Sequence, residues 1–196
     1  SLRSKKTVVK TAKNRKLSST LWLQRQLNDI YIKKAKQEGY CSRAAYKLLE
    51  INQKFNLIKT KNKVIDLGAA PGGWTQVASK IVGNNGLIVA VDLLDLKVQT
   101  SNTIAIKGDF LQNSTLQQII MSLQSKANIV LSDMAPNTTG SKDLDHIKIL
   151  TLIEESFLFA ERILLKGGSL VVKVFQGGLE QQLIEKIKSS FEEVKY

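Results

Sequence analysis

The sequence is poor in the residues that most often build metal centres and disulfides. Its 196 residues include a single cysteine, Cys41, and a single histidine. One cysteine cannot close a disulfide within the chain, which agrees with a reducing, cytoplasmic location. A zinc site and a Cys–His nucleophile both need ligands that the chain barely has, so we expect no metal and no chemistry of that kind.

Long apolar runs are also missing. Hydrophobic residues make up 43% of the chain, but no stretch is long and apolar enough to span a bilayer. We therefore expect no membrane partner. The length is sufficient for one α/β domain with its own core, and we expect that domain to be a monomer.

Acidic residues are scarce in the N-terminal quarter. Residues 1–47 contain 13 lysines and arginines against only Asp29 and Glu38, whereas the remaining residues carry 16 basic and 15 acidic side chains. The net charge of +12 is therefore concentrated at one end, as is typical of proteins that bind nucleic acid. A solvated basic tail is the alternative. We expect a flexible basic arm over residues 1–19 and a single domain over 20–196, with N-terminal helices within 20–55.

The glycines gather in one stretch, Lys63–Trp74, which reads KVIDLGAAPGGW. A short apolar run is followed by a glycine-rich turn and then by residues that favour a helix. This order is typical of loops that close around a nucleotide-like cofactor, because glycine lets a ligand approach the main chain closely. The glycine spacing here matches neither a dinucleotide-binding loop nor a P-loop. The first loop of an S-adenosylmethionine (SAM) methyltransferase does fit, and a plain strand-to-helix turn is the alternative.

Elsewhere the chain alternates between short apolar runs and amphipathic stretches. We predict further strands at 87–92, 103–109, 127–133 and 169–175, with a turn at 166–168 and the start of a sixth strand at 191–196. Helices are expected at 21–36, 43–55, 114–125, 144–165 and 179–190. Ser42 would cap the helix at 43–55. We expect Ile120, on the helix at 114–125, and Ile147, on the helix at 144–165, to face the core. Strands that alternate with helices predict a mostly parallel sheet with helices on both faces.

An acidic residue lies at or near the end of four predicted strands: Asp66, Asp92, Asp109 and Asp133. Ligands of parallel α/β sheets bind at the carboxyl ends of the strands. Asp92 is suited to ribose hydroxyls, Asp109 to an adenine amino group, and Asp133 to the sulfonium and amine end of SAM. For any single aspartate, a helix cap or a solvated loop is an equal alternative.

Lys173 interrupts the apolar run of residues 170–175. A lysine inside a strand is rare unless it has a partner or a task, so we predict that it points into the cleft. Burial and a second cation, for which Lys47 is the candidate, would lower its pKa and favour a role as a base. A lysine that reaches solvent from an edge strand is the alternative.

These residues occur within motifs that resemble the FtsJ family of heat-shock methyltransferases, from about residue 18 to residue 196. The matching segments are SRAAYKL at 42–48, DLGAAPGGW at 66–74, VDLL at 91–94, GDF at 108–110, SDMAPN at 132–137 and VVKVFQG at 171–177. The resemblance implies a Rossmann-like, SAM-dependent methyltransferase fold with a seven-stranded sheet.

The resemblance also implies site residues. The first lysine, the aspartate and the second lysine of the family's Lys-Asp-Lys-Glu tetrad fall on Lys47, Asp133 and Lys173. The glutamate has no counterpart before Tyr196, because Glu192 and Glu193 do not match its motif, and we expect the last hairpin to be incomplete. The family's SAM contacts fall on Gly72, Trp74, Asp92, Asp109 and Asp133.

The expected function is SAM-dependent 2′-O-methylation of a ribose, with uridine as the expected nucleoside, in the ribosomal RNA of the large subunit. Tyr46 is a candidate for stacking on an unpaired base. Two alternatives stay open: methylation of transfer RNA or of a messenger cap, and a non-catalytic RNA-binding factor of ribosome assembly. The unmatched glutamate favours the second alternative slightly, and the set Lys47, Asp133 and Lys173 opposes it.

Overall fold

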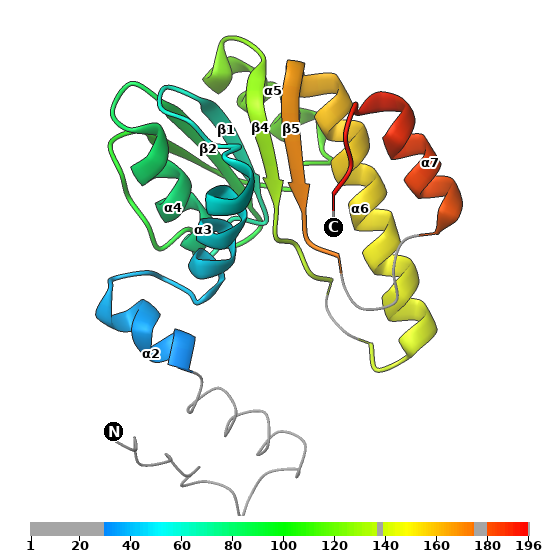
Figure 1. Cartoon of the computed structure of the whole chain (residues 1–196), viewed down its shortest axis with the longest axis horizontal. Coiled ribbons are helices and arrows are strands. Elements are labelled where there is room, and N and C mark those ends of the chain that lie inside the picture. The colour runs from blue at the N-terminus through cyan, green and yellow to red at the C-terminus, as the bar shows by residue number, and fades with distance from the viewer. Residues whose placement is uncertain (1–29, 137–138, 175–179, 196) are drawn as a thin grey trace, which may run out of the picture.

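Five parallel strands form the centre of the molecule in the computed structural model, which describes residues 30–136, 139–174 and 180–195 (Figure 1). The strands lie in the order β3-β2-β1-β4-β5, and every neighbouring pair is parallel. They are β1 (Lys63–Leu67), β2 (Leu87–Asp92), β3 (Thr103–Lys107), β4 (Ala127–Ser132) and β5 (Leu164–Val172). The predicted α/β class is confirmed.

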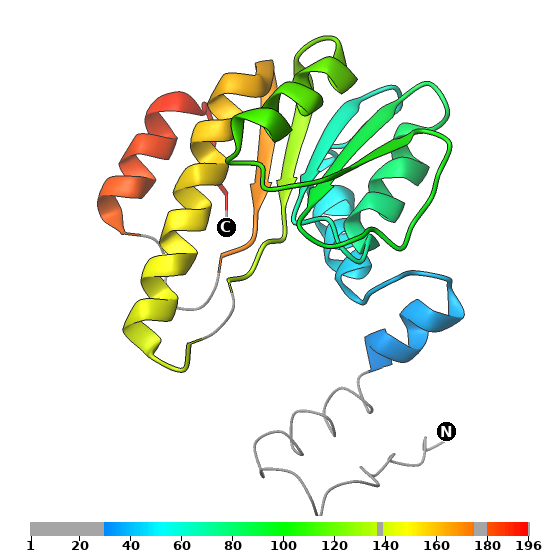
Figure 2. The same cartoon turned by 180° about the vertical axis from the view of Figure 1, so that it is seen from behind.

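Helices connect the strands and cover both faces of the sheet (Figures 1 and 2). They are α2 (Ile30–Gln37), α3 (Ala44–Phe55), α4 (Gly73–Val82), α5 (Asn113–Leu123), α6 (Lys142–Ile163) and α7 (Gln181–Ser190). Residues 21–29 of the helix expected over 21–36 lie outside the described residues, as does the whole of the basic arm expected over 1–19. None of the described helices is long and apolar enough to cross a membrane.

Alternate residues of β1 serve different faces of the sheet, and each face has its own core. Val64 belongs to the cluster formed by α3, α4 and one face, together with Leu48 and Val77. Ile65 belongs to the cluster formed with α5 and α6 on the other face, together with Ile119. Burial on both faces explains why the central strands are continuous apolar runs.

Three local predictions need correction. Helix α3 begins one residue later than expected, with Arg43 at its N-cap and no side-chain cap, so Ser42 does not cap it. Ile120 and Ile147 are exposed rather than inward-facing, because they lie at the margins of the apolar stripes of α5 and α6. Among the described residues 191–195 no strand forms, so the predicted sixth strand is wrong there.

The path of β5 also differs from expectation. The predicted turn at 166–168 lies inside this strand, where the pairing with β4 shifts register between Ala127 and Ile129. Gly167 adopts a φ of +79° there, which a side chain would disfavour. The strand ends at Val172, so Lys173 follows the strand rather than interrupting it.

Candidate active site

The glycine-rich loop joins β1 to α4 at the carboxyl edge of the sheet. The main-chain amide of Gly68 donates to the carbonyl of Val91 at 2.9 Å, which ties the loop to the end of β2. Gly72 precedes α4 with a φ of +119°, and a Cβ there would lie 2.4 Å from Cγ2 of Val98. Only glycine tolerates both the backbone angle and the close approach, so the sequence forces this tight turn.

Asp92, the last residue of β2, holds the same loop from the other side. Its Oδ2 accepts a hydrogen bond from the amide of Ala70 at 2.9 Å, and its Oδ1 accepts one from the amide of Leu94 at 2.8 Å. A carboxylate accepts more than two hydrogen bonds, so these contacts leave capacity for a ligand hydroxyl. Asp109 follows β3 and accepts from the amide of Leu111 at 3.0 Å, with its side chain half-buried.

Trp74 plays a different part from its neighbours in the loop. Its side chain is buried, and its indole Nε1 donates to the carbonyl of Ala44 at 2.8 Å, which joins α4 to α3. The main-chain amide of Trp74 belongs to the first turn of α4, where helical amides have no partner within the helix. The cofactor contact of Trp74 stays a prediction, and because the indole is buried, the main-chain amide is the group that could make it.

Asp133 and Lys173 form an ion pair where β4 and β5 end. Lys173 Nζ lies 2.7 Å from Asp133 Oδ1 and also donates to the main-chain carbonyl of Asp133 at 2.8 Å. The lysine side chain is 31% exposed and the aspartate side chain 24% exposed. The prediction of a partner for Lys173 is confirmed, but the expected deep burial is not. The position after the strand explains this exposure.

Lys47 lies on α3 with an exposed side chain. In the described part of the chain it makes no hydrogen bond or ion pair with Asp133 or Lys173. The structure therefore brings Asp133 and Lys173, two of the three predicted catalytic residues, into contact. The catalytic role of Lys47 stays a prediction.

Tyr46 is not available for base stacking. Its side chain is 8% exposed, with ring centroids of Tyr31 and Tyr40 at 5.5 and 5.7 Å. The hydroxyl donates to Glu38 at 2.9 Å. Burial, followed by the hydrogen bond to Glu38, raises the pKa of Tyr46 to about 12. The tyrosine joins α2 to α3 in this structure.

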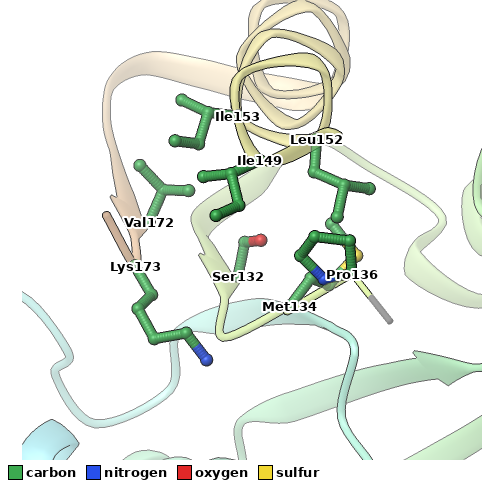
Figure 3. A pocket seen from close by; sticks show the side chains of 8 residues that line it. All are labelled: Ser132, Met134, Pro136, Ile149, Leu152, Ile153, Val172 and Lys173. Atoms are coloured by element: carbon green, nitrogen blue, oxygen red, sulfur yellow. The ribbon is translucent and has the colours of Figure 1, made fainter. Parts of the chain in front are cut away.

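A narrow apolar pocket adjoins the ion pair, between α6 and the ends of β4 and β5 (Figure 3). Met134, Pro136 and Leu152 are among its lining residues, and Lys173 stands at its edge with the ammonium directed away from the apolar side chains. Among the described residues, no group of three or more His, Cys, Asp or Glu side chains is arranged to hold a metal ion.

Asp66 is the residue at this edge to which the sequence assigned no task. It lies one residue before the end of β1 and is 0% exposed. Burial raises the pKa of its carboxyl to about 7; the hydrogen bond from Thr75 opposes the rise, and the charges of Asp133 and Asp92 add to it. An acid within the apolar segment KVIDL was the available signal.

The comparisons with known proteins identify the class first. A ribosomal RNA methyltransferase from Plasmodium falciparum matches with a TM-score of 0.72 and 28% identity over 80% of this chain and 90% of that one. The methyltransferase MycE, solved with Mg and S-adenosylhomocysteine, matches with a TM-score of 0.52 and 18% identity over 72% of this chain and 38% of that one, a likeness of fold alone. The fold is that of a Rossmann-like methyltransferase.

The sequence comparisons identify the family. The model of the FtsJ-like methyltransferases matches residues 40–196. Proteins named ribosomal RNA large subunit methyltransferase E, from Rickettsia akari and Rickettsia bellii, are 48% and 49% identical over 99% of this chain and 87% of theirs. The chain belongs to the FtsJ-like methyltransferase family and is a methyltransferase, as its motifs predicted.

Proposed function

We propose that this methyltransferase modifies a ribose 2′-hydroxyl in the ribosomal RNA of the large subunit, with SAM as the methyl donor and uridine as the expected nucleoside. The names of the relatives from Rickettsia support the substrate. The observation that carries the proposal is the Asp133–Lys173 pair beside the glycine-rich loop. We propose further that the enzyme works as a monomer in the cytoplasm, without a metal.

The residues present fit SAM. The loop turns tightly at Gly72, where Val98 packs against the glycine, and the carboxylates of Asp92 and Asp109 are hydrogen-bond acceptors at or just beyond the ends of neighbouring strands. We assign Asp92 to the ribose hydroxyls and Asp109 to the adenine amino group. Gly72 and the amide of Trp74 would line the donor, and Asp133 would face its amine. SAM supplies an electrophilic methyl group when bound.

Lys173 is assigned to the acceptor hydroxyl. Its ammonium is held by two contacts with Asp133, so its position is fixed before RNA arrives. Such positioning of the reacting groups supplies much of a rate enhancement. Asp133 orients Lys173 and reduces its freedom, and Lys47 is assigned as the second cation near the same hydroxyl. As an ammonium, Lys173 can hold the hydroxyl oxygen in place; to receive the hydroxyl proton it first has to release one of its own protons to solvent.

The test is transfer of a tritiated methyl group from SAM. Large ribosomal subunits, free ribosomal RNA, transfer RNA and capped messenger RNA are offered separately, and the methylated nucleotide is mapped. Label on a 2′-oxygen of large-subunit RNA is expected, and Lys173→Ala serves as the inactive control. If only transfer RNA or only the messenger cap carries the label, then that RNA is the substrate in place of ribosomal RNA. Binding of RNA without any transfer would favour the non-catalytic assembly factor.

A further inference from the structure

Four ionisable side chains share one face of the sheet at its carboxyl edge. In the strand register, Asp66 is opposite Ala90 of β2 and Leu131 of β4, and Leu131 is opposite Val171 of β5. Side chains two residues apart along a strand point to the same face. Asp92 lies two residues beyond Ala90 within β2. Asp133 and Lys173 are the first residues after β4 and β5, where the main-chain amide of Lys173 still donates to the carbonyl of Ser132 at 2.9 Å. Asp66 is therefore on their side of the sheet, the side covered by α3 and α4.

Asp66 occupies the centre of this group and is incompletely satisfied. Its Oδ2 accepts a hydrogen bond from Thr75 Oγ1 at 2.6 Å. Its Oδ1 is buried and, within the described residues, has no hydrogen-bond partner. A buried carboxylate oxygen without a partner is costly, so it is expected either to carry a proton or to meet a cation.

The surrounding charges leave Asp66 as the group whose charge changes. Asp92 accepts two main-chain amides, and Asp133 is paired with Lys173. With all three aspartates ionised, one lysine would face three carboxylates on this face. Thr75, from α4, supplies a hydroxyl but no charge. A single positive charge that arrives near the centre would halve this excess negative charge.

We propose that Asp66 is a positioning residue that distinguishes the methyl donor from the product: its carboxyl is partly protonated while no ligand cation is present, and it ionises fully when a sulfonium enters. This inference rests on the proposed function, because it takes SAM as the donor. The donor and S-adenosylhomocysteine share adenosine, amine and carboxylate, and differ by one methyl group and its positive charge. The proton of Asp66 leaves to solvent when the donor binds and returns when the neutral thioether product remains.

The consequence is a preference for donor over product that depends on pH. Burial raises the pKa of Asp66 to about 7, so the free protein holds a partly protonated carboxyl at neutral pH. If the donor keeps the carboxyl ionised throughout, its affinity relative to the product rises roughly tenfold between about pH 6 and pH 8. Near pH 7, donor binding releases about half a proton more than product binding.

The experiment is isothermal titration calorimetry of the full chain with each ligand, in buffers of different ionisation enthalpy. The dependence of the observed enthalpy on that ionisation enthalpy gives the number of protons released. Asp66→Asn keeps the shape of the side chain and removes its titration. The amines of the two ligands titrate in both proteins, so the difference between wild type and variant isolates Asp66.

Two further variants keep the test decisive. Glu154→Gln removes an exposed carboxylate that pairs with Lys186 on α7, and should leave the excess proton release unchanged. Thr75→Val removes the hydrogen bond that holds the pKa of Asp66 down. Thr75→Val should therefore move the midpoint of the pH dependence of the donor preference upward. This variant tests the proposal even if Asp66→Asn fails to fold.

The proposal is supported if the wild type releases more protons on binding the donor than on binding the product, and if Asp66→Asn loses this excess. Equal release with both ligands, or an excess that persists in Asp66→Asn, overturns it and leaves the proposed function intact. Failure of both ligands to bind overturns the proposed function and this inference together. A carboxyl ¹³C NMR titration of the ligand-free protein provides a second readout, with a midpoint near 7 expected for Asp66.

Discussion

Replacement of Asp66 by asparagine should make the stability of the protein less sensitive to pH. The carboxyl is 0% exposed, and burial raises its pKa from the ordinary value of 3.8 to about 7. A carboxyl with a raised pKa binds its proton more tightly in the folded than in the unfolded chain. Its contribution to stability is therefore present below the unfolded value and is lost as the pH rises through the folded value.

The magnitude follows from the size of the shift. The pKa of Asp66 differs between the unfolded and folded chains, from 3.8 to about 7. At about 1.4 kcal/mol per pKa unit, this difference corresponds to roughly 4 kcal/mol of stability, lost between a pH below both values and a pH above both. Between about pH 5 and pH 8 the loss is roughly 2.5 kcal/mol, because part of the range lies below pH 5. Asparagine does not titrate. The buried amide adds a cost of its own, about 1–3 kcal/mol, but that cost does not change with pH.

The assay is urea unfolding of the ligand-free wild type, Asp66→Asn and Glu154→Gln at the two pH values. The free energy of unfolding of Asp66→Asn relative to wild type should rise by roughly 2.5 kcal/mol from about pH 5 to pH 8. Glu154→Gln should show no comparable change, since Glu154 is exposed. The reasoning is refuted if the relative stability of Asp66→Asn is the same at both pH values while the unfolding transitions stay two-state.

Four further outcomes are expected. Lys173→Ala should abolish most methyl transfer with little change in SAM affinity or melting temperature, and Lys173→Arg should also fail, because guanidinium stays protonated; near-normal turnover of Lys173→Arg would exclude proton removal by this residue. Asp92→Ala and Asp109→Ala should each weaken SAM binding about ten- to a hundredfold, checked by calorimetry. Gly72→Ala should destabilise the protein by about 1–3 kcal/mol in urea unfolding, because of its φ of +119° and the missing space for a Cβ. Deletion of residues 1–19 should weaken RNA binding and flatten its dependence on salt without changing SAM affinity, and an unaltered slope would favour a merely solvated tail.

The sequence by itself determined the class of fold and indicated the edge of the sheet at which the candidate site lies. Alternation of apolar runs with amphipathic stretches is enough to predict a parallel sheet, because hydrophobic periodicity reports burial directly. The aspartates at or near strand ends and the glycine-rich loop then indicate the carboxyl edge as the candidate site. The sequence also predicted that Lys173 has a partner or a task, because a charge within an apolar run is costly.

Only the tertiary structure decided which of those residues meet, and how deeply each is buried. Lys173 lies just beyond its strand because the neighbouring strand β4 ends at Ser132, which is the partner of Val172. Tyr46 is covered by Tyr31 and Tyr40, a contact between segments that no local pattern encodes. The unpartnered oxygen of Asp66 is likewise a property of the packed sheet. Hydrophobic periodicity predicts which face of a helix or strand a residue occupies. The contacts and the desolvation of its side chain depend on neighbours that are distant in sequence.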